Sequence, residues 1–73
     1  MKETILTLRE EEILALVKDG YSSQEIAHKM RLSDNTIKVN LRILRAKLNA
    51  RSTCHALIIA LRKGYISLNS TGV

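Results

Sequence analysis

The sequence predicts a small all-α domain built from four helices. Its 73 residues contain no proline and only three glycines, and 45% of them are hydrophobic, mostly leucine, isoleucine and alanine. This composition favours helices. Helix-start signals also occur at four places, each followed by apolar residues three or four positions apart. A chain of this length buries only about 60% of its unfolded surface, so we expect one domain over residues 1–73 that is further stabilised by a partner subunit.

The first helix is predicted over residues 8–18. Thr7 and Glu10 have the spacing of a capping box, in which a hydroxyl and a carboxylate each accept a hydrogen bond from a backbone N–H at the helix start. Gly20 follows the last turn and suits the left-handed conformation that ends many helices. The side chains expected to face inward are Ile13, Leu14 and Val17.

A second helix, over residues 23–30, and a third, over residues 34–48, are separated by only three residues. Ser22 and Glu25 repeat the capping-box spacing before the second helix, and Ser33 is the expected cap of the third. A helix, a short turn and a second helix in this order are typical of a helix-turn-helix motif. The expected inward side chains are Ile26, Ala27 and Met30 in the second helix and Ile37, Leu41, Leu44 and Leu48 in the third.

The fourth helix is predicted over residues 53–63, between Ser52 as its cap and Gly64 as its stop signal. Asn49, which tolerates the left-handed conformation, ends the helix before it. The fourth helix is apolar on nearly all sides, so it is either a fully buried core helix or an interface between two copies. We favour the interface. Its residues would be Cys54, Leu57, Ile58 and Leu61, while Ala56, Ile59 and Ala60 face the core. The core is expected over about 6–66, with both ends frayed.

Charge is divided unequally along the chain. The first 34 residues carry seven acidic and five basic side chains, whereas the last 39 carry seven basic and no acidic ones. A concentration of positive charge in one half of a small domain favours binding of a polyanion.

The outward face of the third helix carries the side-chain types that read DNA. With the apolar stripe turned inward, this face holds Asn35, Lys38, Val39, Arg42 and Ala46. Arginine and lysine donate to guanine, asparagine pairs with adenine, and valine packs on the thymine methyl group in a major groove. Beside this face lie candidates for contacts to the DNA backbone: Thr36, Asn40, Arg45 and Lys47.

Four blocks of sequence in order resemble the LuxR-type (GerE-type) DNA-binding domain. They are Leu6-Thr7-x-Arg9-Glu10, Ser22-x-x-Glu25-Ile26-Ala27, Ser33-Asp34-Asn35-Thr36-Ile37-Lys38-Val39-Asn40 and Lys47-Leu48-Asn49-Ala50-Arg51-Ser52. The resemblance implies that Lys38, Val39 and Arg42 contact base edges and that Ser23, Thr36 and Lys47 contact the DNA backbone. The hydroxyl of Ser22, at the start of the second helix, is a further candidate for a backbone contact.

The resemblance also implies dimerisation through the fourth helix. Three positions depart from the family pattern: Asn40 stands where histidine is usual, Arg31 where a turn glycine is common, and Thr53 where a basic residue is common. The family domain usually ends a larger regulator that also carries a receiver or ligand-binding domain. We expect this chain to be a stand-alone, single-domain member.

Other functional classes lack support. No nucleophile and base pair, paired carboxylates or phosphate-binding loop can be assembled, so we expect no enzyme and no cofactor. His28 and His55 have no partners at metal-ligand spacing, and the single Cys54 excludes an internal disulfide. No apolar run is long enough to span a membrane, and no signal-peptide core is present, so we expect a cytoplasmic protein that does not bind a membrane. We also expect no small-molecule ligand.

These observations predict a bacterial transcriptional regulator that binds double-stranded DNA as a homodimer. The alternative is a protein-interaction module of the same fold, whose fourth helix captures another regulator. A smaller possibility is that the acidic run Glu10-Glu11-Glu12 contacts RNA polymerase or another regulator. The sequence does not indicate the operator or whether the protein activates or represses.

Overall fold

The computed structural model describes residues 4–67 and contains four helices and no strand within that range. They are α1 (Leu8–Lys18), α2 (Ser23–Met30), α3 (Asp34–Lys47) and α4 (Thr53–Arg62). The all-α prediction is confirmed. The predicted ends of the last two helices were one residue too late, because Leu48 and Lys63 are C-cap residues. The predicted fraying beyond Leu68 lies outside the described residues.

The helix starts form as the capping patterns predict. The Thr7 hydroxyl accepts from the Glu10 backbone N–H at 3.1 Å, and the Glu10 carboxylate accepts from the Thr7 N–H at 2.9 Å. Ser22 and Glu25 make the same reciprocal pair at 3.2 and 2.8 Å. Each box satisfies two backbone donors that a helix start otherwise leaves without partners. The other two helices each begin with a single side-chain cap. The Ser33 hydroxyl accepts from the Thr36 N–H, and the Ser52 hydroxyl accepts from the His55 N–H.

The turn between α2 and α3 depends on an unusual backbone conformation. Arg31 takes the left-handed region with φ of 58° and ψ of 42°. The next residue, Leu32, then donates its backbone N–H to the Ala27 carbonyl at 2.9 Å, which closes the end of α2. For a non-glycine residue, this conformation costs roughly 1–2 kcal/mol of conformational free energy. Asn49 after α3 adopts the same region with φ of 54°, as predicted.

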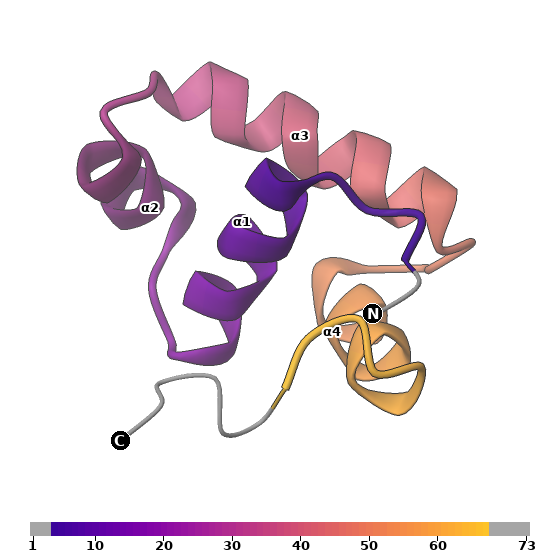
Figure 1. The fold of residues 1–73 in the computed structure, drawn as a ribbon. Helices are drawn as coiled ribbons and strands as arrows, with labels where there is room; N and C mark the ends of the chain where they lie inside the picture. The colour runs from indigo at the N-terminus through magenta and orange to yellow at the C-terminus, as the bar shows by residue number, and fades with distance from the viewer. Residues whose placement is uncertain (1–3, 68–73) are drawn as a thin grey trace.

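The helices are arranged around one side of α3. Figure 1 shows α2 at one end of α3 and α4 at the other, with α1 between them, all on the same side. Their contact surface is a core in which five large side chains are fully buried: Ile13, Leu14, Ile26, Ile37 and Leu44. No helix formed by residues 4–67 lies over the opposite side of α3. No helix in the described part of the chain is long and apolar enough to cross a bilayer.

The predicted core was largely correct but differs at its margins. Val17, Met30, Leu41 and Ile59 are only partly buried, although they pack against the buried residues. Leu6, before α1, and Ile66, after α4, are 6% and 7% exposed and complete the core from the two ends of the described chain. The periodicity of a helix cannot indicate these two residues, because both lie outside helices.

Candidate nucleic-acid interface

The outward face of α3 is open to solvent along its whole length. Its predicted members Asn35, Lys38, Val39, Arg42 and Ala46 are all exposed, whereas Ile37 and Leu44 are fully buried on the other side. The sequence did not place Ile43 on this face, yet its side chain is 44% exposed. Ile43 lies one turn after Val39, so the two form a short apolar strip beside Arg42.

Two arginines of α3 have no partner within the described residues. Neither Arg42, which is exposed, nor Arg45, which is half-buried, forms a hydrogen bond or ion pair with another described side chain. Arginine has five donors in a planar arrangement that suits guanine and phosphate equally well. Their charges are therefore available to an external anion.

Lys38 is held by a neighbour. Its ammonium lies 3.2 Å from one carboxylate oxygen of Asp34, one turn earlier in the helix. The other oxygen of Asp34 accepts a hydrogen bond from the Ser23 hydroxyl at 3.0 Å. Ser23 opens α2, so this chain of contacts joins the two helices of the helix-turn-helix. The sequence did not indicate it.

Lys47 has a partner inside the domain rather than a free ammonium. Its Nζ atom donates to Glu10 Oε1 at 2.8 Å, and Glu10 is only 4% exposed. The pair therefore fastens the end of α3 to the start of α1. This structural role was not predicted, and the proposed phosphate contact of Lys47 stays a prediction. The burial of Glu10 also removes it from the acidic surface that Glu11 and Glu12 were expected to share with it.

The surroundings of Glu10 lower the pKa of its carboxyl group. Burial alone would raise this pKa, since a charge is less stable away from water. The hydrogen bond from Lys47, the backbone hydrogen bond from Thr7 and the positive charge of Lys47 outweigh burial and hold the pKa below its ordinary value of 4.5. Glu10 is therefore ionised in the folded chain near neutral pH.

The small polar residues expected at the DNA backbone already have internal partners. The hydroxyls of Thr36 and Ser33 share a hydrogen bond of 2.7 Å, and Asn40 Nδ2 donates to the Thr36 carbonyl at 2.8 Å. Ser22 is exposed, with its hydroxyl oxygen accepting from the Glu25 N–H. Their DNA contacts remain predictions, and each would use the donor or acceptor capacity that these bonds leave free.

The four residues predicted to form a dimer interface on α4 have different surroundings. Cys54 is exposed and Ile58 is 47% exposed, so both can contact another chain. Leu57 and Leu61 are half-buried and pack against the core. The side facing the core consists of Ala56 and Ala60, both fully buried, with Ile59 partly covered.

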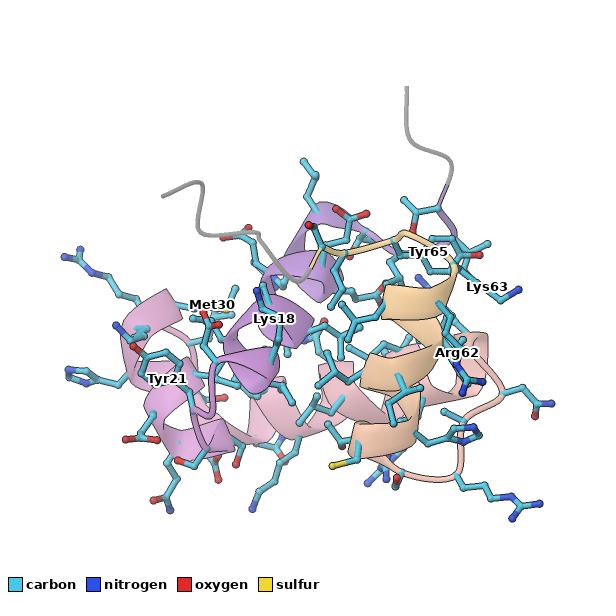
Figure 2. The ribbon with its side chains drawn as sticks, turned by 90° about the horizontal axis from the view of Figure 1, so that it is seen from below. Lys18, Tyr21, Met30, Arg62, Lys63 and Tyr65 are labelled. Atoms are coloured by element: carbon cyan, nitrogen blue, oxygen red, sulfur yellow. The ribbon has the colours of Figure 1, made fainter. Side chains whose placement is uncertain are left out.

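Positive charge after Asp34 is not confined to α3. Figure 2 shows Arg62 and Lys63 at the C-terminal end of α4 beside Tyr65, on the side of the molecule away from Tyr21 and Met30. The acid-free half of the sequence therefore supplies cations to more than one surface. Among the described residues, no group of three or more His, Cys, Asp or Glu side chains could hold a metal ion.

Comparison with known families identifies the domain. The family model of bacterial regulatory proteins of the luxR family, named for GerE, matches residues 4–60. The chain belongs to the luxR family. It is therefore a member of a family of regulatory proteins, and the expectation that it is not an enzyme is confirmed by this membership.

Several known regulators are similar to this chain over most of its length. The HTH-type transcriptional regulator AlkS of Pseudomonas putida is 41% identical over 61 residues, which is 84% of this chain and 7% of AlkS. The nitrate/nitrite response regulator protein NarP of Escherichia coli K12 is 38% identical over 60 residues, which is 82% of this chain and 28% of NarP. The chain thus spans less than a third of the length of these relatives.

A solved structure of the transcription factor GerE has the same fold. It superimposes with a TM-score of 0.87 at 30% sequence identity, covering 92% of this chain and all of the GerE chain. This match confirms the four-helix LuxR-type architecture. It also supports the resemblance that the four sequence blocks indicated.

Proposed function

We propose that the chain is a DNA-binding transcriptional regulator that binds duplex DNA with α3 in the major groove. The observation that carries this proposal is the open outward face of α3. On this face Arg42 has no side-chain partner among residues 4–67, and the other three helices lie on the opposite side. An α-helix with its side chains is roughly 10–12 Å wide and fits a major groove of about 12 Å. The relatives AlkS and NarP are named as a transcriptional regulator and a response regulator, which supports the same function.

The side chains of α3 divide into two roles under this proposal. Asn35, Lys38, Val39 and Arg42 contact base edges, since they lie near the centre of the exposed face. Arg45, at the side of the helix, contacts phosphate, and the hydroxyls of Ser22 and Thr36 add weaker hydrogen bonds to the backbone. DNA binding would place the protein in the bacterial cytoplasm.

The second part of the proposal is that the regulator acts as a homodimer through α4. Cys54 and Ile58 present an apolar surface that is left exposed by the described part of the chain. A second copy would cover it in a two-fold interface, in which the same residues meet their counterparts. Two α3 helices would then be held at a fixed separation for two half-sites.

The alternative function is a protein-interaction module of the same fold. The exposed Ile58 favours it as much as it favours a homodimer, because the α4 of a different regulator could cover the same surface. Such a module would need little DNA affinity of its own. The two functions therefore differ in how strongly the isolated chain binds DNA.

A salt titration with random-sequence duplex DNA, followed by selection of bound sequences from a random pool, tests the proposal. A regulator that neutralises phosphates loses affinity steeply as salt rises, with a slope of about 0.9 per phosphate. We expect a clear salt dependence and a symmetric consensus sequence. Weak binding at every salt concentration with no consensus would instead support the protein-interaction module.

A further inference from the structure

We propose that Asp34 and Lys38 act together as one reader of a G·C base pair and that Asp34 suppresses binding to DNA of the wrong sequence. This inference rests on the proposed DNA-binding function. It adds an acidic residue to a surface on which only basic, amide and apolar side chains were expected to read bases.

Asp34 is held in place by contacts from two helices, Lys38 of α3 and Ser23 of α2. Lys38 Nζ lies 3.2 Å from Asp34 Oδ2, and Ser23 Oγ of α2 donates to Asp34 Oδ1 at 3.0 Å. Both oxygens of Asp34 are thus engaged, each by a different element. The Lys38 side chain is 63% exposed and the Asp34 side chain is 34% exposed, so both can be reached by a ligand.

An exposed pair of this kind usually has little energetic significance. Lysine and aspartate one turn apart on a helix stabilise it by about 0.3–0.5 kcal/mol. The bond from Ser23 distinguishes this pair, because it holds the carboxylate in one position before any ligand arrives. Asp34 also begins α3, and the first turns of a recognition helix are the part that contacts base edges.

The paired groups match the edge of a G·C base pair. In the major groove guanine presents its O6 and N7 acceptors, and cytosine presents the N4 amino group as a donor beside them. Lys38 can donate to guanine while Asp34 accepts from cytosine. A lysine alone would recognise only the acceptors, which phosphate oxygens also provide, so the carboxylate makes the contact selective.

Asp34 should also weaken binding to DNA that lacks the right base pair. Its negative charge neutralises Lys38 and is repelled by the phosphate backbone. On a matching base pair the amino group of cytosine compensates for this repulsion, and on other sequences nothing does. Asp34 is the only acidic residue from α3 onward, so no other carboxylate in that part of the chain can serve this purpose.

The test compares Asp34→Asn with Glu12→Gln, a variant with the same change in net charge. Glu12 is exposed on the side of α1 roughly opposite its buried residues, and therefore away from α3. Binding to the selected site and to random duplex is measured over a range of salt. For Asp34→Asn we expect the ratio of the two affinities to fall at least about fivefold, the lower limit for one good base contact. The salt slope on random DNA should rise by roughly 1.

Sequence selection with each variant identifies the base pair concerned. Asp34→Asn and Lys38→Gln should lose preference for G·C at the same position, whereas Glu12→Gln should lose none. Ser23→Ala removes the hydrogen bond that positions Asp34, so it should weaken that preference partially. Because the net charge is unchanged, the salt slope should stay the same. An equal loss of affinity for the selected site and for random duplex would instead indicate a phosphate contact of Ser23, and would contradict its role in positioning Asp34.

The outcomes separate this inference from the function on which it rests. If the wild type binds duplex DNA with a consensus but Asp34→Asn and Glu12→Gln behave alike, the proposed role of Asp34 and Lys38 is wrong and the DNA-binding function stands. The conclusion is the same if Asp34→Asn and Lys38→Gln lose preference at different base pairs. If the wild type does not bind DNA, both proposals fail together. Thermal unfolding followed by circular dichroism confirms that each variant is folded.

Discussion

At the scale of single residues, the ion pair between Glu10 and Lys47 connects parts of the chain that are 37 positions apart. Glu10 also completes the capping box with Thr7, so one carboxylate both begins α1 and holds the end of α3. A buried charge is tolerated only when it is paired and hydrogen-bonded. Glu10 therefore adds a polar contact to the apolar core that holds α3 against α1.

Replacement of Lys47 by Met should destabilise the fold. The variant leaves the Glu10 charge buried without its cation, which should lower the free energy of unfolding by about 1–3 kcal/mol. Lys63→Met is the control, since the Lys63 side chain is exposed and has no partner among the described residues. It should change stability by less than about 0.5 kcal/mol. Urea unfolding at pH 7 measures both. Equal effects would show that the ion pair contributes nothing.

Stability should also depend on pH through Glu10. Because the pKa of this carboxyl group is lower in the folded chain than in the unfolded chain, its ionised form stabilises the fold. The contribution is fully present above the ordinary value of 4.5 and is lost as the pH falls through the lowered folded value. Unfolding of the wild type and of Glu10→Gln, measured from pH 7 down to acid, should show a smaller loss on acidification in the variant. Parallel curves would contradict this assignment.

Arg42 and Arg45 should differ in what they contribute to DNA binding. Arg42→Ala should lower affinity for the best site by about 1–3 kcal/mol and relax preference at one or two base pairs. Arg45→Ala should weaken binding to all sequences to a similar extent and reduce the salt slope by roughly 1. Titrations of both variants against the selected site and random DNA distinguish the two patterns. Unchanged affinity and preference in Arg42→Ala would mean that another face of the domain reads the bases.

At the scale of elements, the ten residues of α4 pack on the core and, in the proposed dimer, would also form the interface. Ala56 and Ala60 are small enough to bring the helix close to the core, and Leu57 and Leu61 cover the core from the sides. Only Cys54 and Ile58 are exposed among the residues predicted for the interface. A substitution at Leu57 or Leu61 would therefore disturb the fold and the proposed dimer at once, and Ile58 gives the cleaner test.

Ile58→Asp should produce a monomer if α4 pairs with itself. An unpaired carboxylate cannot be buried in an apolar interface without a large penalty. Affinity for a two-half-site DNA should fall too, since the second half-site no longer binds intramolecularly. Leu8→Asp is the control for charge, because Leu8 is 80% exposed and lies on α1. Sedimentation velocity that shows a monomeric wild type at tens of micromolar, with and without DNA, would count against the interface.

How far the sequence predicted these elements depends on the range of the interactions involved. Helix starts, the left-handed Asn49 and the exposed face of α3 were correct, because caps and periodicity are set by residues within a few positions of one another. The Glu10–Lys47 pair and the Ser23–Asp34 bond were missed, since each joins different helices and depends on how those helices pack. Half-burial of Leu57 and Leu61 was missed for the same reason.

At the scale of the whole molecule, a two-fold dimer would fix the spacing of its DNA sites. If each α3 enters a major groove on the same side of the duplex, the selected site should be an inverted repeat with half-site centres roughly 10 base pairs apart. Insertion of five base pairs turns one half-site to the opposite side, and should reduce affinity nearly to that of a single half-site. An insertion of ten should restore part of it. Gel-shift titrations with these three duplexes provide the test, and an asymmetric consensus would contradict two-fold binding.

The way the core closes has a consequence for the order of folding. Most of the domain consists of helices joined by short turns, whose contacts form between residues close in sequence, and such topologies fold quickly. Leu6 and Ile66 are the exception, because they enter the same core from opposite ends of the described chain. To bury both in one core, the longest loop of the described chain must close. We therefore expect Leu6 and Ile66 to pack into the core after the α2–α3 pair has formed, and to be the first residues to leave it when the protein unfolds.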